Sequence, residues 1–265
     1  PLLIANIQTP VPKDQSVEAA EEALEALEEL LKERADEIAA FIIEPLIQGA
    51  GGMHMYHHAY LKGARELTKA YDVHLIADEI MTGFGRTGEM FACDHADISP
   101  DFMTLSKGLT GGYLPLSVVM TTNDVYQAFY CDYNDYKAFL HSHSYTGNPL
   151  ACSAALATLD IFENNEVLGE NAKKSKYIMS QLEKFTSLEN VKEIRQQGMV
   201  TAIELQGYEA TERVGVKVYE YGLTQGVLLR PLGTVIYFMP PYVISYDEID
   251  KMIAVAYEGI KKVAK

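Results

Sequence analysis

The sequence predicts an α/β protein, with a mostly parallel sheet in a large domain and a smaller α/β domain at its C-terminal end. Short segments of unbroken apolar residues alternate along the first half with segments whose apolar residues recur at helical spacing. Unbroken apolar strands between helices are typical of a parallel sheet buried on both faces. The order of elements changes further along the chain, which places the two domains at residues 1–165 and 166–265.

The first part of the chain alternates between helices and strands. Residues 1–15 contain three prolines and are expected to be extended. Ser16 can cap an amphipathic helix, because apolar residues follow it at helical spacing among many glutamates. The predicted elements are, in order, a helix over 17–35, a strand over 38–43, a helix over 58–71 and strands over 73–77, 102–106 and 116–120.

The second part of the chain has a different order of elements. Helices come first, and short strands then mix with the helices that cover them, which is typical of a small α/β domain. The predicted elements are helices over 148–163 and 168–185, strands within 191–205, a helix over 212–225, strands over 227–230 and 235–239, and a closing helix over 246–263.

The composition argues against several classes of partner. The 265 residues include 22 Lys and Arg against 37 Asp and Glu, a formal net charge of −15. This surplus disfavours a nucleic acid or an anionic membrane as partner. No apolar run approaches the roughly 18 residues that a membrane-spanning helix needs, and the start of the chain has no signal-peptide pattern.

The cysteines and the first residue carry two further expectations. Cys93, Cys131 and Cys152 are odd in number, widely spaced and not in a CxxC arrangement. They predict a reduced, cytoplasmic compartment without a disulfide framework or a zinc site. The chain begins with Pro1 and not with Met, so we expect it to be the later part of a longer protein.

Polar residues follow three of the predicted strands: Glu44, Asp78 and Lys107. In parallel α/β sheets such residues line the crevice in which ligands bind. A lysine at the end of a buried strand can be desolvated, which lowers the pKa of its amine and suits it to covalent attack on a carbonyl. A carboxylate there needs a positive partner, such as a protonated pyridine nitrogen.

Each of these residues also has a simpler interpretation. Taken alone, Lys107 reads as a solvated surface lysine, and Asp78 as a helix cap or a member of a structural salt bridge. The two together favour a pyridoxal phosphate site, because that cofactor needs an amine and a carboxylate in one crevice. The glycine-rich residues 81–88 between them lack the patterns of a Walker loop and of a Rossmann turn.

Two later segments are candidates for binding anionic groups. Residues 141–149 are rich in hydroxyls and precede a helix, which suits a phosphate, although a polar loop that caps the helix is an equal alternative. Two histidines lie in this loop without acidic or thiol ligands, so a metal site is disfavoured. Arg230 ends a strand, with Tyr237 seven positions on, and offers a two-pronged donor for a carboxylate; the alternative is an internal ion pair.

The segments IADEIMTGFGRTG at 76–88 and LSKG at 105–108 resemble the signature of class III pyridoxal-phosphate-dependent aminotransferases. The resemblance extends from FIIEP at 41–45 to the final helix, and the spacing between Asp78 and Lys107 fits that family. It implies the type I aminotransferase fold and an active site shared within a homodimer. Within the class, RPLG at 230–233 and IYFMPPY at 236–242 most resemble the enzymes of biotin biosynthesis that aminate 8-amino-7-oxononanoate to 7,8-diaminononanoate.

The resemblance implies roles for five residues around the cofactor. Lys107 would be the catalytic residue, which attaches the cofactor and then moves the proton between it and the substrate carbon. Asp78 would pair with the pyridine nitrogen, and Ile80 would pack on one face of the ring. His143 and Ser144 would reach the cofactor phosphate of the neighbouring subunit.

The resemblance also implies how the substrates bind. Arg230 would bind the carboxylate of the oxo acid, with Tyr237 beside it, and Ser142 and Arg86 would lie near substrate. S-adenosylmethionine is the implied amino donor and lysine the alternative, because residues 141–146 depart from the commoner His-Gly-Pro-Thr. Met81 stands where many class III members carry Gln, which weakens an assignment to the ornithine or 4-aminobutyrate enzymes.

Two other interpretations stay open at this point. The protein is another class III ω-aminotransferase with a different amine or amino ketone as substrate, or the chain is an inactive C-terminal fragment without pyridoxal phosphate. The fragment interpretation is motivated by a segment that this sequence lacks. In the family, this N-terminal segment supplies part of the phosphate cup and an aromatic side chain that stacks on the cofactor ring. Such a fragment would hold the cofactor weakly and expose apolar patches.

Overall fold

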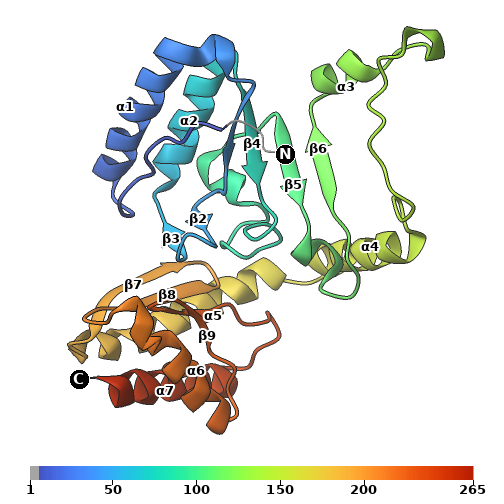
Figure 1. Cartoon of the computed structure of the whole chain (residues 1–265). Helices are drawn as coiled ribbons and strands as arrows, with labels where there is room; N and C mark the ends of the chain where they lie inside the picture. The colour runs from blue at the N-terminus through green and yellow to red at the C-terminus, as the bar shows by residue number, and fades with distance from the viewer. Residues whose placement is uncertain (1–5, 265) are drawn as a thin grey trace. The chain divides into compact units, whose positions relative to one another are not determined.

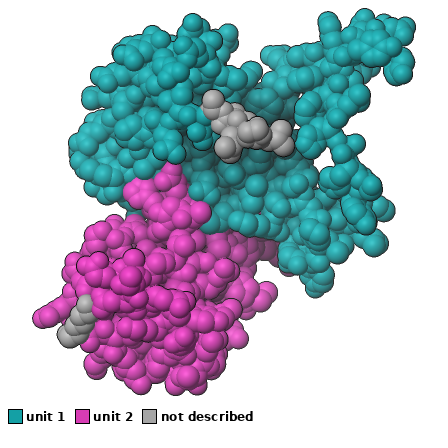
Figure 2. All heavy atoms as spheres, in the orientation of Figure 1, with its two compact units in different colours: residues 1–46, 56–83, 91–160 teal, residues 47–55, 84–90, 161–265 magenta. Residues whose placement is uncertain are grey.

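The computed structural model describes residues 6–264, which form two compact units (Figure 2). Unit 1 comprises Pro1–Leu46, Tyr56–Gly83 and Phe91–Asp160; unit 2 comprises Ile47–Met55, Phe84–Met90 and Ile161–Lys265. The predicted domains were continuous in sequence, whereas two short segments of the first half belong to unit 2. Within the predicted extended segment 1–15, residues 1–5 lie outside the described range, and residues 6–12 have no regular secondary structure.

Unit 1 is built on a four-stranded sheet in the order β1-β4-β5-β6 (Figure 1). Its strands are β1 (Ala40–Ile43), β4 (His74–Asp78), β5 (Phe102–Leu105) and β6 (Val118–Thr121). β1 and β4 run parallel, as do β4 and β5, which confirms the mostly parallel sheet. β6 runs antiparallel to β5. The carboxyl ends of β4 and β5 therefore meet at one edge of the sheet.

Two helices cover part of this sheet: α1 (Val17–Arg34) and α2 (His58–Ala70). The Ser16 hydroxyl accepts a hydrogen bond from the Ala19 amide at 3.1 Å, so it caps α1 as predicted. The two helices pack closely at Gly63, where an added Cβ would lie 2.4 Å from a methyl carbon of Leu24. The buried residues Leu27, Leu31, Ala64 and Val73 form the core beneath them.

The expectation that the sheet is buried on both faces is wrong for the described residues. Ile42 is 62% exposed, Val119 64% and Met120 53%, and all four residues of β6 are exposed. The apolar pattern of these strands is that of a doubly covered sheet. Within residues 6–264, however, α1 and α2 pack on one side only of β1 and β4, and no element covers β6.

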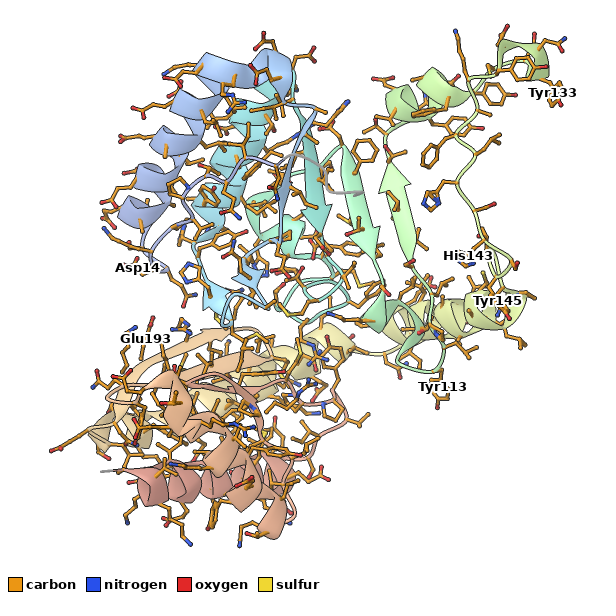
Figure 3. All side chains as sticks on the ribbon, viewed as in Figure 1. Asp14, Tyr113, Tyr133, His143, Tyr145 and Glu193 are labelled. Carbon is orange, nitrogen blue, oxygen red and sulfur yellow. The ribbon has the colours of Figure 1, made fainter. Side chains whose placement is uncertain are left out.

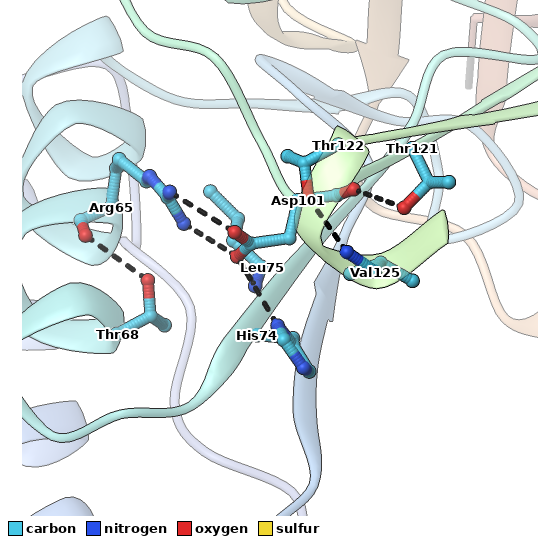
Figure 4. Close-up of polar contacts among 8 residues, drawn as sticks. All are labelled: Arg65, Thr68, His74, Leu75, Asp101, Thr121, Thr122 and Val125. Atoms are coloured by element: carbon cyan, nitrogen blue, oxygen red, sulfur yellow. Dashed lines mark hydrogen bonds and ion pairs between the residues drawn. The ribbon is translucent and has the colours of Figure 1, made fainter. Parts of the chain in front are cut away.

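An ion pair fastens α2 to the end of the sheet opposite the carboxyl edge (Figure 4). Arg65 donates to both carboxylate oxygens of Asp101, at 2.6 and 3.2 Å. The same carboxylate accepts from the Leu75 amide at 2.7 Å, and Nδ1 of His74 lies 3.8 Å away. The contacts from Arg65 and Leu75 hold the pKa of Asp101 below its usual value, although burial acts in the opposite direction.

After β6 the chain forms an exposed arm that contains α3 (Asn123–Phe129) and the short helix η4 (Tyr133–Asp135) (Figure 1). The arm returns through residues 136–148 to α4 (Pro149–Asn164). Figure 3 shows Tyr133, His143 and Tyr145 on the arm. Its exposed aromatic side chains are those of Tyr126, Phe129, Tyr130, Tyr133, Tyr136, Phe139 and Tyr145.

Unit 2 contains a four-stranded antiparallel sheet in the order β7-β8-β10-β9. Helices α5, α6 and α7 contribute to an apolar core in this unit, and the hairpin β2–β3 lies beside β7. The elements are β2 (Ile47–Gln48), β3 (His54–Met55), α5 (Val167–Leu182), β7 (Val191–Gln197), β8 (Val200–Leu205), α6 (Val214–Thr224), β9 (Arg230–Leu232), β10 (Val235–Phe238) and α7 (Tyr246–Val263). Among the described residues, no helix is both long enough and apolar enough to cross a membrane.

Candidate active site

Asp78 is the last residue of β4 and lies opposite Thr104 of β5 in the parallel register. Its Oδ1 accepts hydrogen bonds from the Ile80 amide and the Thr104 hydroxyl, both at 3.1 Å. These two donors fix the carboxylate at the edge of the sheet. Neither of them uses Oδ2, so this oxygen is available to a positive donor that enters the crevice.

Lys107 lies two positions after the end of β5, beyond Ser106, and begins the short helix η3 (Lys107–Thr110). Its backbone φ is +43°, a value that residues other than glycine rarely adopt. The turn is held by hydrogen bonds from the Ser106 hydroxyl to the Leu116 carbonyl and from the Thr110 hydroxyl to the Leu114 carbonyl, at 2.7 and 2.6 Å. Lys107 is three positions beyond Thr104, and so lies at the same sheet edge as Asp78.

Lys107 is exposed in the structure of this chain, in agreement with its simpler interpretation as a solvated lysine. The reason is local: Tyr113, Leu114 and the strand β6 that follow the turn are themselves exposed, so no side chain among residues 6–264 covers the amine. The Nζ of Lys107 makes no hydrogen bond or ion pair with any described residue. The structure thus brings the two predicted groups to one edge and leaves both open to a ligand.

Sequence reasoning missed Glu79, the residue next to Asp78. Its carboxylate is fully buried and accepts from the Thr82 hydroxyl at 2.6 Å and the Cys93 amide at 2.8 Å. Its backbone amide also donates to the Thr104 carbonyl at 3.0 Å, which extends the pairing of β4 with β5. Burial, and then Glu79, raise the pKa of the Cys93 thiol. The signal in the sequence was a second carboxylate after an apolar strand, which needs internal donors.

The hydroxyl-rich loop before α4 is exposed throughout residues 141–147. Nδ1 of His143 accepts from the Tyr145 amide at 3.1 Å, and the His143 amide donates to the Thr146 hydroxyl at 3.0 Å. Asn148 caps the helix through its side-chain oxygen, which accepts from the Leu150 amide at 3.0 Å. The capping role therefore falls to Asn148, and Ser142, His143 and Ser144 are accessible to a ligand.

Arg86 lies in unit 2 and is partly buried. Its Nη1 donates to the Pro240 carbonyl at 2.7 Å, and its Cζ lies 4.4 Å from the centre of the Tyr242 ring. Burial lowers the pKa of Arg86, and Tyr242 opposes this effect. Within residues 6–264 no carboxylate lies within ion-pair distance of the guanidinium. A guanidinium without an anionic partner is suited to bind an anionic ligand.

Arg230 begins β9 and is exposed, and Tyr237 lies opposite it on β10. The Cζ of Arg230 is 5.6 Å from the centre of the Tyr237 ring. The alternative of an internal ion pair is not observed for Arg230 in the described part of the chain.

The candidate residues thus form two groups, one in each unit. Unit 1 carries Asp78, Ile80, Lys107, Ser142, His143 and Ser144; unit 2 carries Arg86, Arg230 and Tyr237. In the same part of the chain, no group of three or more His, Cys, Asp or Glu is arranged to hold a metal ion.

A mostly parallel sheet with a carboxylate and a lysine at one carboxyl edge, followed by a smaller α/β unit, is the arrangement of a pyridoxal-phosphate-dependent transaminase. Comparison with known proteins supports this class. The family model described as aminotransferase class-III matches residues 2–259. The chain belongs to the class-III aminotransferase family.

Two relatives are particularly informative. The adenosylmethionine-8-amino-7-oxononanoate aminotransferase of Helicobacter pylori is 48% identical over 269 residues, which cover 100% of this chain and 61% of that protein. The enzyme of the same name from Anoxybacillus flavithermus is 44% identical over 274 residues, which cover 98% of this chain and 60% of that protein. The chain thus spans about three fifths of the length of these curated relatives.

Solved structures confirm the fold. The crystal structure of adenosylmethionine-8-amino-7-oxononanoate aminotransferase from Methanocaldococcus jannaschii has a TM-score of 0.88 and 40% sequence identity, and the match covers 91% of this chain and 57% of that one. A thermostable (S)-enantioselective omega-transaminase from Thermomicrobium roseum has a TM-score of 0.87 at 29% identity, over 94% of this chain and 56% of that one. The predicted fold class and family are therefore confirmed.

Proposed function

We propose that the protein containing this chain transfers an amino group to 8-amino-7-oxononanoate, forming 7,8-diaminononanoate for biotin biosynthesis. S-adenosylmethionine is the proposed amino donor, with lysine as the alternative. The observation that carries the chemistry is the placement of Asp78 and Lys107 at one edge of the parallel strands β4 and β5. The identity of the substrate is supported by curated relatives of that name at 37–48% identity.

The residues at the sheet edge fit pyridoxal phosphate as cofactor. Asp78 keeps Oδ2 available beside an Oδ1 that two donors already fix, which suits a pyridine nitrogen that carries a proton. Lys107 presents an amine that has no hydrogen-bond or ion-pair partner among residues 6–264, as a covalent attachment to the cofactor aldehyde requires. When bound, this cofactor supplies an electron sink that stabilises the carbanion formed at the substrate carbon. Ile80 is half-buried next to Asp78 and is proposed to pack on the ring.

Lys107 is proposed to act as the acid and base that moves a proton to and from the substrate carbon. The positive φ of Lys107 and the two hydroxyl bonds around its turn hold the start of its side chain in place. General acid–base catalysis works best when the pKa of the amine is near the working pH. A lysine reaches that range by losing contact with water, so we propose that other parts of the assembled protein cover Lys107.

A homodimer with shared active sites is the proposed assembly, in the cytoplasm. His143 and Ser144 lie on an exposed arm with open hydroxyl and imidazole groups, and the arm carries exposed aromatic side chains of the kind that is enriched at protein interfaces. We propose that these two residues bind the cofactor phosphate of the neighbouring subunit. The surplus of acidic residues disfavours a nucleic acid or an anionic membrane as a further partner.

The arginines of unit 2 are proposed to bind the carboxylates of the substrates. Arg230 is exposed, and one end of its side chain rests near Tyr237, so its planar donors can take the carboxylate of the oxo acid. Arg86 donates to the Pro240 carbonyl, its one hydrogen-bond acceptor in the part of the chain that the structure describes, and is proposed to lie on the substrate side. Ser142 is exposed at the hydroxyl-rich loop and is proposed to lie near the substrate.

The decisive experiment uses the full-length protein with pyridoxal phosphate. We expect a visible absorbance band, which shifts in Lys107→Ala because the covalent attachment is lost, and formation of the diamine from 8-amino-7-oxononanoate with one of the two donors. A band unchanged in Lys107→Ala would refute the role of Lys107. Turnover of other amino ketones without any diamine would indicate a different class III ω-aminotransferase. Intact-mass measurement tests the remaining alternative, a fragment without cofactor.

A further inference from the structure

Arg86 has a side chain that the protein uses only in part. One guanidinium nitrogen, Nη1, donates to the Pro240 carbonyl, while the face of the guanidinium lies on the ring of Tyr242 at 4.4 Å. A guanidinium has five N–H donors in a rigid fork. With no carboxylate within ion-pair distance among residues 6–264, the rest of the fork remains for a ligand. The orientation of that fork depends on what holds the guanidinium plane.

Tyr242 is held from three directions within unit 2. Its hydroxyl donates to the Phe84 carbonyl at 2.6 Å, two positions before Arg86. Its ring meets the ring of Phe162 edge to face, with centres 6.4 Å apart and planes at 84°. Its backbone carbonyl accepts from Nζ of Lys174 at 2.5 Å. Burial raises the pKa of Tyr242, which keeps the phenol a neutral donor. The ring therefore offers a rigid surface.

The backbone of Arg86 is anchored separately from its side chain. The Arg86 carbonyl accepts from the Met199 amide at 3.0 Å, and the Thr87 carbonyl accepts from the side chain of Gln197 at 3.0 Å. An added Cβ on Gly198 would lie 2.3 Å from the Thr87 carbonyl carbon, so the two backbones are in direct contact. Loss of the Tyr242 ring is thus expected to free the guanidinium without releasing the loop.

We propose that Tyr242 is a positioning residue for Arg86, which holds the guanidinium flat so that its free N–H groups face a substrate carboxylate. The inference rests on the proposed function, since it requires Arg86 to contact substrate. Cation–π contact over a rigid ring restricts rotation of the guanidinium plane, and a two-pronged bond to a carboxylate depends on that plane. Tyr242 itself is not required to touch substrate.

The test compares variants of the full-length holoenzyme in each half-reaction separately. Arg86→Gln identifies the substrate whose KM depends on Arg86. For that same substrate, we expect Tyr242→Leu to raise KM about tenfold, the effect of a well-placed cation–π contact, with kcat much less affected. Tyr242→Phe keeps the ring and is expected to restore most of the affinity. In the Arg86→Gln background, Tyr242→Leu is expected to add nothing, because residues that act as a unit are non-additive.

A matched control is available in the same unit. Nζ of Lys262 lies over the ring of Tyr221 at the same 4.4 Å, so Tyr221→Leu removes an equivalent contact far along the chain from Arg86 and is expected to leave both KM values unchanged. Melting temperatures show whether Tyr242→Leu folds; if it does not, Tyr242→Met, which also removes the ring, takes its place, and Tyr242→Phe remains the variant that restores the affinity.

Several outcomes would overturn the inference. They are an effect of Tyr242→Leu that is equally large in the Arg86→Gln background, equal losses in both half-reactions, or no change in KM. The inference would also be overturned if Arg86→Gln still formed the diamine with KM values equal to those of the parent enzyme. Failure of the parent enzyme to form the diamine would refute the proposed function instead. The two hypotheses therefore fail on different measurements.

Discussion

Replacing Asp101 by Asn tests whether charge at the end of the sheet opposite the carboxyl edge stabilises unit 1. The Asp101 carboxylate takes two hydrogen bonds from Arg65 and one from the Leu75 amide (Figure 4). The asparagine has the same size, and its remaining oxygen can still accept from Leu75. The substitution therefore removes the charge and one of the paired contacts, and leaves the Arg65 guanidinium without an anion.

The expected loss follows from the burial of this pair. The side chains of Arg65 and Asp101 are 21% and 17% exposed, between a surface ion pair and a fully buried one. Exposed pairs contribute about 0–1 kcal/mol, and breaking a buried pair costs about 3–5 kcal/mol. A hydrogen bond to a charged group contributes about 1.5–3 kcal/mol. We expect Asp101→Asn to lower the free energy of unfolding at pH 7 by about 2 kcal/mol.

The stability difference between parent and variant is expected to depend on pH in a definite direction. The contacts with Arg65 and Leu75 lower the pKa of Asp101 in the folded state from its ordinary value of 3.8. A carboxyl group with a lowered folded pKa contributes stability that is present above the unfolded pKa and is lost as the pH falls through the folded pKa. The difference between parent and variant should therefore be constant from pH 7 to about pH 5 and shrink below pH 4.

The assay is urea unfolding of the full-length protein, followed by far-UV circular dichroism at a series of pH values. Glu22→Gln is the control, because Glu22 pairs with Lys13 at a fully solvated site where both side chains are 63% exposed, and no measurable change is expected. A loss for Asp101→Asn that is the same at pH 7 and pH 3 would refute the electrostatic explanation. A loss no larger than that of Glu22→Gln would refute the contribution of the pair.

Three further substitutions test other parts of the structure. Gly198→Ala should lower the free energy of unfolding by more than about 2 kcal/mol, because φ is +57° and the added Cβ would lie 2.3 Å from the Thr87 carbonyl carbon. Gly207→Ala has φ of +82°, and its added Cβ would meet no atom of residues 6–264 within 4 Å, so it isolates the backbone part of the effect in the same urea titration. Ser245→Ala removes the N-cap of α7 and should cost about 1 kcal/mol, whereas Ser245→Asp should retain most of the stability. Asp78→Asn should slow both half-reactions of the holoenzyme by about 100-fold or more with an unchanged circular dichroism spectrum, and equal activity would refute the pairing of Asp78 with a ring nitrogen.

The longer helices were predictable because each carries a local signal. The helix at α7 was predicted over 246–263, the residues it occupies, and α1 and α2 were predicted to within one residue at their C-terminal ends, since apolar residues recur there at helical spacing. The short elements β2, β3 and α3 were not predicted, and the strand expected over 227–230 is β9, which begins at Arg230. The direction of a strand has no such signal. The apolar run that forms β6 reads the same in either direction, and its antiparallel pairing with β5 became visible only in the structure.

Burial was the property that local pattern predicted least well. The run FII in β1 predicts a strand covered on both faces, yet Ile42 is 62% exposed, since burial depends on elements that need not be near in sequence. The same limit applies to Lys107, for which the sequence left both a desolvated and a solvated amine open and which is exposed in this chain. The residues at the strand ends were nevertheless identified correctly as neighbours. Parallel strands bring their carboxyl ends together whatever covers them, so the placement of Asp78 and Lys107 follows from topology alone.

For Arg86, the sequence identifies the residue but does not predict the orientation of its side chain. The GRTG segment indicated an arginine on the substrate side, but a motif defines only the residue and not the orientation of its side chain. The acceptor of its hydrogen bond, the Pro240 carbonyl, is 154 positions away, and the carbonyl that Tyr242 binds, that of Phe84, is 158 away from it. Both contacts form only when unit 2 folds around the Phe84–Met90 segment. The orientation of the Arg86 guanidinium is thus set by the folding of unit 2, although Arg86 itself lies within the segment 76–88 that the sequence singles out.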